Sequence, residues 1–299
     1  MSTGTSLYPE RTNRGDSHLK TWMKRALPFR LRGRVNAARD RVRTVTLVAH
    51  LMRLLSNWRE VWIAHKLGTT FPELRLRCGL VLTHGKGDQP LFSFEETFRE
   101  QPYTREHFYR PNRSDTVIDI GANIGIFAIY LQYRARGIAV HCFEPAVASR
   151  NRLQSNVSIN GLGSCVSIYP YAVFDKNAVL HLKQHVHTVE RSLVRDEKDI
   201  PGAEPVESVT LARALELSGV KHVDLLKIDI EGAELEVILG SGHEEWKGIK
   251  RVALEYHGNL RPNCLETLTL ALRERGYSYI RAIPSSSHIT SQGILHARR

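Results

Sequence analysis

The sequence has few cysteines and no long apolar run. Its four cysteines, among 299 residues, form no CxxC pair. That spacing predicts neither a structural zinc site nor a disulfide framework, and it favours reduced thiols in a cytoplasm. No stretch reaches the roughly 18 apolar residues of a membrane span, and residues 1–31 contain no apolar segment typical of a secretory signal. We therefore expect a cytoplasmic protein.

Positive charge is unevenly distributed along the chain. The formal net charge is +11, and residues 1–68 hold 14 Lys and Arg against 4 Asp and Glu. The remaining residues hold 28 against 27, so they are nearly neutral. This pattern predicts a basic extension at residues 1–70 and a neutral domain at residues 71–299. A neutral domain without an RNA-binding signature argues against nucleic acid as a partner.

The basic extension itself has two parts. Residues 1–20 are polar and are predicted to be disordered. Residues 34–66 carry apolar side chains at helical spacing, accompanied by arginines. The apolar positions are Ala38, Val42, Val45, Val48, Met52, Leu55 and Trp62, and the arginines are Arg39, Arg41, Arg43, Arg53 and Arg59. Three interpretations stay open: a helix packed on the domain or on a second subunit, a helix on the inner, anionic membrane surface, or a nucleic-acid arm.

The rest of the chain alternates between strand and helix patterns. Residues 74–84 resemble two short strands around Cys78 and Gly79, and residues 91–110 a short helix with an aromatic-rich approach. Strands are then predicted at 116–121, 138–143, 166–173, 223–230, 250–256, 277–283 and 293–298, with helices at 124–134, 146–159, 232–240 and 264–275. This alternation predicts an α/β fold with a mostly parallel sheet covered on both faces.

The segment TVIDIGANIGIFAIY, residues 116–130, leads from the first of these strands into a helix. Gly121 and Gly125 flank the turn, with Ala122 and Asn123 between them, and glycine allows the backbone to approach a ligand closely. A dinucleotide site normally reads GxGxxG, which this turn lacks. Asp119 would repel a pyrophosphate, but it suits a ligand with an ammonium group.

Glu144 ends the second strand, 23 residues after Gly121. An acidic residue at this distance commonly accepts hydrogen bonds from the hydroxyls of a ribose. A ligand with an adenosine, an amine and a carboxylate, but no phosphate, is S-adenosylmethionine. The turn and Glu144 together therefore predict this cofactor.

The runs VIDIGANIG, FEP, SNVSIN and KIDIEGAELEVILG resemble the FkbM family of S-adenosylmethionine-dependent methyltransferases over about residues 71–283. The resemblance implies a Rossmann-like, seven-stranded class I methyltransferase sheet with a final antiparallel strand. It also implies O-methylation of a hydroxyl on a sugar, a glycolipid or a polyketide-type small molecule. The stretch SFEETFREQPY matches the family's approach segment and ends in an aromatic residue, Tyr103. We assign Tyr103 to the cofactor together with Ala172. Where the family often reads TLD, this chain reads Thr210-Leu211-Ala212.

Catalytic candidates follow the later strands. In VDLLKIDIEGAE, alternation places Lys227 and Asp229 on one strand face, with Asp229 beside Gly121 as a contact for cofactor and acceptor alike. Glu231 and Glu234 are predicted in the first turn of the next helix. Glu255 and His257 end the neighbouring strand.

A sugar hydroxyl needs a base as methyl transfer develops. His257 suits this role by its intrinsic pKa, and Asp229, Glu231 or Glu255 would serve if burial raises its pKa. Structural roles compete with this interpretation, since acidic residues favour a helix N-terminus and Lys227–Asp229 would also serve as an ion pair. The sequence leaves the base open among these four residues.

The remaining motifs carry weaker predictions. His181, His185 and His187 would share one face of a strand, but no carboxylate or cysteine pattern completes a metal site, so no metal is predicted. The long polar segment 187–205, which includes Ser192, is interpreted either as disordered or as a lid over the acceptor. Asn156 and Asn160 are expected to organise a helix end.

The function expected is O-methylation of a small-molecule or carbohydrate acceptor, with a lipid-linked acceptor as one option. Two alternatives are an RNA methyltransferase that uses the basic arm, and a non-catalytic cofactor-binding module.

Overall fold

The computed structural model describes residue 42 and residues 44–85, 87–105, 108–184, 191–194, 203–286 and 289–299. It divides the chain into two compact units, Met1–Arg53 and Leu54–Arg299, whereas the sequence indicates a boundary at residue 70. The predictions for residues 1–20, for His185 and His187, and for most of the segment 187–205 lie outside the described residues.

The helix predicted over residues 34–66 is interrupted in its described part. Residues 44–54 are helical, residues 55–57 are not, and α3 spans Trp58–Leu67. Leu55 instead forms a β-bridge with Leu76. The Asn57 side chain donates to the Glu73 carbonyl at 2.9 Å and accepts from the Arg75 amide at 3.0 Å. The prediction of one helix was wrong, because residues 55–57 form hydrogen bonds with the segment 73–76 instead of continuing the helix.

The main sheet has seven strands in the order β12-β13-β11-β10-β3-β4-β5. Strands β5, β4, β3, β10 and β11 are parallel, and β13 is antiparallel to both of its neighbours. The bounds are β3 Thr116–Ile120, β4 Ala139–Phe143, β5 Val166–Tyr169, β10 Leu225–Ile228, β11 Arg251–His257, β12 Tyr279–Ser286 and β13 Ile289–Arg298. A seven-stranded, mostly parallel sheet with one antiparallel strand near its edge is what the sequence predicts, so the predicted sheet is confirmed.

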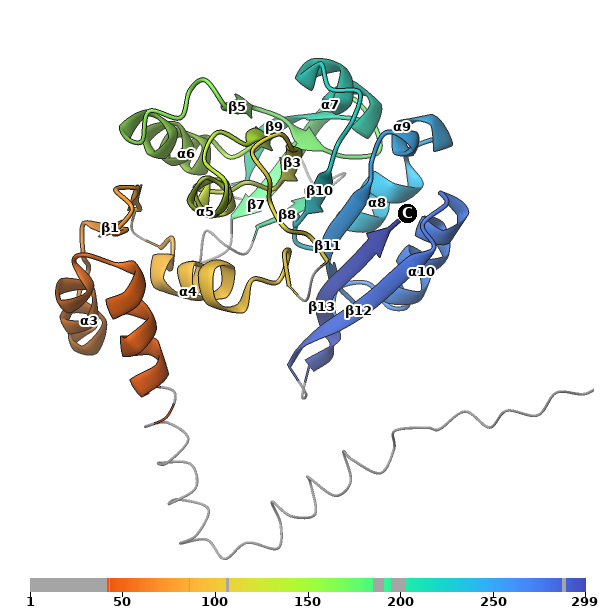
Figure 1. Ribbon diagram of the computed structural model, residues 1–299. Coiled ribbons are helices and arrows are strands. Elements are labelled where there is room, and N and C mark those ends of the chain that lie inside the picture. Colours follow the sequence, from red (N-terminus) through yellow and green to blue (C-terminus); the bar gives the residue numbers. More distant parts are fainter. Residues whose placement is uncertain are drawn as a thin grey trace, which may run out of the picture. The chain divides into compact units, whose positions relative to one another are not determined.

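Helices cover both faces of this sheet (Figure 1). One face packs against α7 Leu211–Ser218, α8 Glu234–Leu239, α9 His243–Lys247 and α10 Cys264–Glu274, whose apolar residues share a core with Ile118, Ile120, Leu226 and Ile228. Helices α5 Ile126–Arg134 and α6 Val147–Ile159 follow β3 and β4. The helices α7 and α9 were not predicted from the sequence.

A second sheet has the order β6-β9-β7-β8, with bounds β6 Ala172–Val173, β7 Ala178–Gln184, β8 Arg191–Val194 and β9 Glu204–Val209. The single strand predicted over 166–173 was wrong, because β5 ends at Tyr169 and β6 begins in this other sheet. Pro170 follows β5 at once, and a proline has no amide hydrogen to continue the ladder. His181 lies in β7, and among the described residues no group of His, Cys, Asp and Glu could hold a metal ion.

A small hairpin precedes the main sheet, as the sequence predicts. It pairs β1 Glu73–Arg75 with β2 Val81–Thr83. Asn156 and Asn160 of α6 and its C-cap hold β2, because their side-chain oxygens accept the amides of Thr83 and Val81, each at 2.7 Å. Next come α4 Pro90–Glu95 and the π-helix η1 Glu96–Glu100, which bring the chain to the site.

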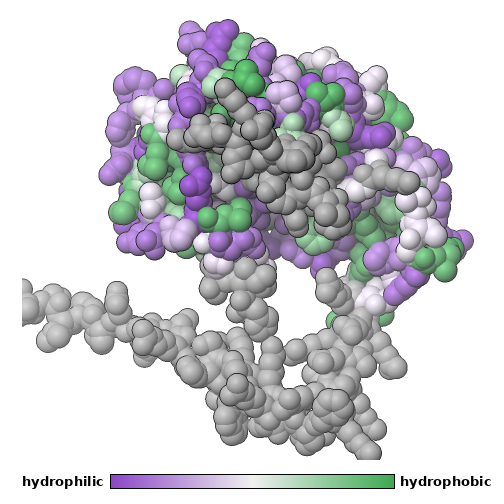
Figure 2. Space-filling view, turned by 180° about the vertical axis from the view of Figure 1, so that it is seen from behind, coloured by the Kyte–Doolittle hydropathy of each residue, from purple (hydrophilic) through white to green (hydrophobic). Residues whose placement is uncertain are grey.

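Exposed apolar side chains are distributed over several elements. Examples are Val147 and Ile159 at the ends of α6, Leu239 in α8 and Leu270 in α10. Figure 2 shows hydrophilic and hydrophobic residues intermixed on the face that it presents. Within the described ranges, no helix combines the length and the apolar character needed to cross a bilayer.

Candidate active site

The carboxyl ends of β3, β4, β10 and β11 meet at a cleft of about 1010 Å³. The chain leaves β3 toward β4 and β5 and later returns to β10 on the other side of β3, so strand order reverses here. Ligands of α/β sheets bind at such a point. Residues predicted for the site that line the cleft are Tyr103, Gly121, Ala122, Asn123, Glu144, Ala172, Asp229, Glu231, Glu255 and His257.

The glycine turn has a backbone that requires glycine. Gly121 has φ +79°, and a Cβ there would overlap the carbonyl oxygen of Asp229. The amides of Gly121 and Ala122 both donate to the Phe143 carbonyl, at 3.0 and 3.1 Å. Gly125 is the N-cap of α5 at φ +87°, and a Cβ there would meet the Leu153 side chain rather than backbone; Gly125 does not line the cleft. Gly125 therefore shapes the turn from behind.

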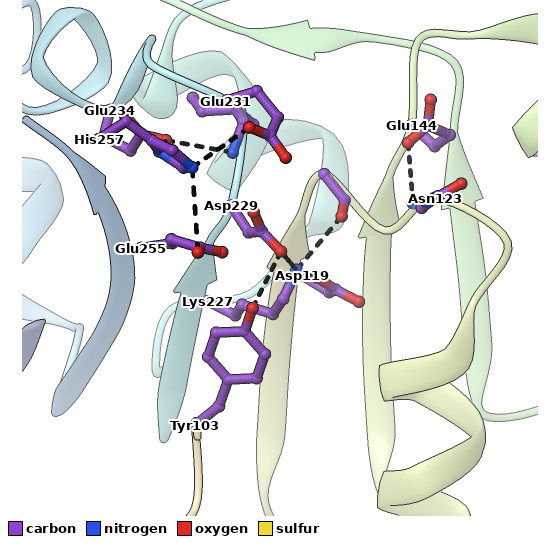
Figure 3. A network of polar contacts seen from close by, with 12 residues as sticks. Tyr103, Asp119, Asn123, Glu144, Lys227, Asp229, Glu231, Glu234, Glu255 and His257 are labelled. Carbon is purple, nitrogen blue, oxygen red and sulfur yellow. Dashed lines mark hydrogen bonds and ion pairs between the residues drawn. The ribbon is translucent and has the colours of Figure 1, made fainter. Parts of the chain in front are cut away.

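Glu144 lies across the turn from the other acidic residues (Figure 3). Its Oε2 accepts the Asn123 amide at 2.8 Å, and its Oε1 accepts the Ala146 amide at 2.9 Å. Two backbone donors thus orient the carboxylate, which is buried but lines the cleft. Each oxygen has a second lone pair, so a pair of ribose hydroxyls fits this group.

Asp119 is completely buried and is not among the residues that line the cleft. Its Oδ1 accepts from Lys227 Nζ at 2.9 Å, and Nζ also donates to the Gly121 carbonyl at 3.2 Å. Burial lowers the pKa of Lys227, but Asp119 and Asp229 raise it by more, so the ammonium stays charged. The carboxylate predicted to meet an ammonium of the ligand is therefore placed against a lysine of the protein.

Asp229 is held from two sides. Tyr103 Oη donates to its Oδ2 at 2.9 Å, and Lys227 Nζ lies 3.5 Å from the same oxygen (Figure 3). The Lys227 ammonium also lies 5.2 Å from the centre of the Tyr103 ring. Burial favours the neutral carboxyl, but Lys227 and then His257 outweigh it, so the pKa of Asp229 is lowered. Asp229 is therefore an oriented, ionised carboxylate.

His257 lies between carboxylates. Its Nδ1 is 3.0 Å from Glu234 Oε1, and its Nε2 is 3.2 Å from Glu231 Oε2 and 3.9 Å from Glu255 Oε1. Burial lowers the pKa of His257, but hydrogen bonds to Glu231 and Glu234 raise it to about 11. At neutral pH the ring is an imidazolium with two donors, which has no lone pair for a proton.

The sequence predicted Glu231 and Glu234 in one helical turn, and this prediction was wrong. Glu231 precedes α8 with φ +53°, followed by Gly232 at φ +100°, and α8 begins at Glu234. The Glu234 carboxylate accepts the Gly232 amide at 3.1 Å, which closes the turn. The helix starts late because Glu231 and Gly232 have left-handed backbone angles, and Glu231 lies at the cleft beside His257.

Glu255 differs from Asp229 in its charge. Burial and then the charge of Asp229 raise the pKa of Glu255 well above its usual range. The neutral form of Glu255 is therefore favoured beside the ionised carboxylate of Asp229.

Sequence reasoning missed many of the residues that line the cleft, and three of them bear on its chemistry. They are Glu96 of η1 and two exposed apolar residues, Phe92 at 61% and Leu260 at 52% of full exposure. The segment SFEETFREQPY carried the signal for Glu96, but its three glutamates are indistinguishable without the structure. The side chain of Ser192 lies outside the description.

The residues present fit S-adenosylmethionine. The glycine turn removes side chains from the floor beside Asp229, and Glu144 offers paired acceptors for a ribose. The opposite end of the cleft is rich in carboxylates, which suit a ligand with a cationic sulfonium.

Known proteins match this chain in sequence. The family model described as Methyltransferase FkbM domain matches residues 119–279. The chain is 26% identical to 31-O-demethyl-FK506 methyltransferase FkbM of Streptomyces tacrolimicus over 235 residues, which cover 69% of this chain and 89% of the relative. It is 28% identical to Methyltransferase sdnD of Sordaria araneosa over 197 residues, which cover 55% and 74%.

A solved structure is similar as well. The crystal structure of Methyltransferase FkbM from Methylobacillus flagellatus KT has a TM-score of 0.48 and 16% identity, covering 87% of this chain and 60% of that chain. Because the family match spans more than half of the chain, the protein belongs to the FkbM methyltransferase family.

Proposed function

We propose that this methyltransferase transfers a methyl group from S-adenosylmethionine to a hydroxyl group of its acceptor. The observation that carries the proposal is the arrangement of the cleft. One end offers the glycine turn and Glu144, and the other brings Asp229, Glu231 and Glu255 together. The first end fits an adenosine, and the second holds charged groups able to orient a hydroxyl.

S-adenosylmethionine supplies an electrophilic methyl group when it is bound. The chain positions the reactants, which is the main requirement for an in-line displacement. Glu144 accepts hydrogen bonds from the ribose, and the ionised Asp229 lies fixed between Tyr103 and Lys227. His257, as a cation, donates to Glu231 and Glu234 and thereby holds the turn before α8.

The acceptor we propose is a small molecule or carbohydrate with an apolar portion, including a glycolipid. The exposed side chains of Phe92 and Leu260 at the cleft support an apolar portion. The name of the Streptomyces tacrolimicus relative, 31-O-demethyl-FK506 methyltransferase FkbM, supports O-methylation of a small molecule. An RNA acceptor is less well supported, because a cleft lined with carboxylates repels phosphates.

A radiolabelled methyl transfer assay tests this proposal. The wild-type protein is offered S-adenosylmethionine with sugars, glycolipids, polyketide-type alcohols and RNA in parallel. We expect transfer to a hydroxylated small molecule, and a loss of about 10²-fold in Asp229→Asn with the fold intact, because the ionised carboxylate that positions the reactants is lost. Asp224→Asn is the matched control, because Asp224 accepts the Thr116 amide at the opposite end of the sheet. Methylation of RNA alone would overturn the proposal.

We also propose that residues 34–66 contact an anionic membrane surface, which suits a lipid-linked acceptor. In α3, Arg59 lies over Trp58 at 5.3 Å and Lys66 over Trp62 at 4.5 Å, while Ile63 and Leu67 are exposed. Tryptophans, basic residues and exposed apolar side chains on one helix are typical of a membrane interface.

Sedimentation with phosphatidylglycerol vesicles at low salt tests the membrane contact. We expect the wild-type chain to sediment and Ile63→Ser, at an exposed apolar position of α3, to sediment less. Leu270→Ser, at an exposed apolar position of α10, is the matched control and should behave as wild type. If the full chain stays in the supernatant, the extension serves packing instead.

A further inference from the structure

Three glutamates at the end of α4 and in η1, which are Glu95, Glu96 and Glu100, have different surroundings. Glu95 lies 2.7 Å from Arg99, and Glu100 lies 3.2 Å from the same guanidinium. Glu96 has no ion pair or side-chain hydrogen bond among the residues that the structure describes, although it is half-buried and lines the cleft. An unpaired carboxylate at a half-buried position needs an explanation, because burial of a charge is costly.

The backbone explains how Glu96 reaches the cleft. The Gln101 amide donates to the Glu96 carbonyl at 3.0 Å, which is the i→i+5 bond of a π-helix. Such a turn holds one more residue than an α-helical turn and often occurs at functional sites. Glu96 and Thr97 both line the cleft, whereas Glu100 at the far end of the turn is exposed.

The charges that face Glu96 come from several elements. Burial and then Asp229 raise the pKa of Glu96 to about 7, with Glu100 and Glu231 adding to the rise and Lys227 opposing it. Glu96 in turn contributes to the raised pKa values of Tyr103 and Glu255. Glu96 therefore changes its charge near neutral pH, where a general base is most effective.

The other acidic and basic groups of the cleft suit this role less well. His257 is already protonated, because its pKa is about 11. Asp229 has a lowered pKa and already accepts a hydrogen bond from Tyr103, and the pKa of Glu255 is well above its usual range. Glu231 is engaged with His257.

We propose that Glu96 is the general base of this enzyme, accepting the proton of the acceptor hydroxyl from the wall of the cleft formed by η1. The inference rests on the proposed transfer to a hydroxyl. As the acceptor O–H bond breaks toward Glu96, the acceptor oxygen bonds to the methyl carbon. The carbon–sulfur bond breaks with its electron pair moving to sulfur, which leaves S-adenosylhomocysteine, a methyl ether and a protonated Glu96.

The position of Glu96 can be tested without an acceptor. S-adenosylmethionine has a cationic sulfonium, whereas S-adenosylhomocysteine has a neutral thioether, and the two share all other charged groups. An ionised Glu96 near the reacting methyl therefore attracts the sulfonium of S-adenosylmethionine but not the thioether of S-adenosylhomocysteine. We therefore expect the affinity ratio of the two ligands, measured by calorimetry, to shift by about tenfold toward S-adenosylmethionine as pH rises through about 7.

The Glu96→Gln variant should lose this pH dependence and still bind both ligands. Glu100→Gln is the matched control on the same π-helix, and it should keep the dependence with an equal or slightly lower midpoint. If Glu96→Gln keeps the wild-type dependence, or if the wild-type ratio is flat, Glu96 is not beside the reacting methyl and the inference is overturned. Failure of the wild-type protein to bind either ligand would instead overturn the proposed function.

Kinetics then test the base itself on the best acceptor from the methyl transfer assay. The wild-type rate should rise with pH and reach a plateau above about 7. This rising limb of the pH–rate profile reports a base that must be ionised to act. Glu96→Gln should lose about 10²-fold in kcat together with that limb, and Glu96→Asp should restore part of both. A Glu96→Gln rate that keeps the limb would overturn the role of base.

Discussion

The two ends of the cleft are built in different ways. At the end with Gly121 and Glu144, the backbone determines the shape, since amides orient the carboxylate and a left-handed glycine clears the floor. At the end with Asp229 and His257, side chains of opposite charge orient one another. The first end should therefore be sensitive to added volume, and the second to changes of charge and pH.

The largest effect is expected from adding one methyl group to the glycine turn. Gly121→Ala places a Cβ against the Asp229 carbonyl at a positive φ. The backbone must shift, so we expect a loss of about 3 kcal/mol in the free energy of unfolding, measured by denaturant titration.

Gly161→Ala separates the two causes of that loss. Gly161 has φ +62°, but a Cβ there meets nothing within 4 Å. It should lose only about 1 kcal/mol, the conformational cost alone. Equal losses in the two variants would show that the close approach to Asp229 contributes nothing.

A smaller effect is expected from removing the Glu144 carboxylate. Glu144→Ala takes away the acceptor for the ribose hydroxyls, so binding of S-adenosylmethionine should weaken by about 1–3 kcal/mol in calorimetry. Glu204→Ala is the control, because the Glu204 carboxylate likewise accepts a backbone amide, that of Val147, at 2.9 Å. Unchanged affinity in a folded Glu144→Ala protein would refute the ribose contact.

The smallest effect concerns pH at the charged end. The folded-state pKa of His257, about 11, lies above the usual value of about 6.5. Its contribution to stability is therefore complete below about pH 6.5 and is lost as pH rises toward about 11. Across this window the melting temperature of the wild-type protein should therefore fall further than that of His257→Gln, by roughly 2–4 °C for each kcal/mol of this contribution.

His222→Gln is the control for this pH series, since His222 is exposed. Its melting curve should follow the wild type across the alkaline range. If His257→Gln also falls in parallel with the wild type, the imidazolium does not stabilise the folded state.

The charged end also shows why part of the site escaped prediction. Strand alternation was sufficient to group Lys227 with Asp229, because side chains on a strand point alternately to its two faces. Alternation did not reveal that Asp119 also accepts a hydrogen bond from the Lys227 ammonium, since that contact joins residues 108 positions apart. The contact between Tyr103 and Asp229 spans 126 positions and was equally inaccessible.

The sequence by itself determined the family, the sheet and the glycine turn, because strand alternation and left-handed glycines are properties of short segments. Only the tertiary structure decided that residues 166–173 divide between two sheets and that Glu231 precedes its helix. It also decided the protonation of His257 and the exposure of Glu96 to the cleft. Burial and charge arise from contacts between distant residues, and no local pattern encodes them.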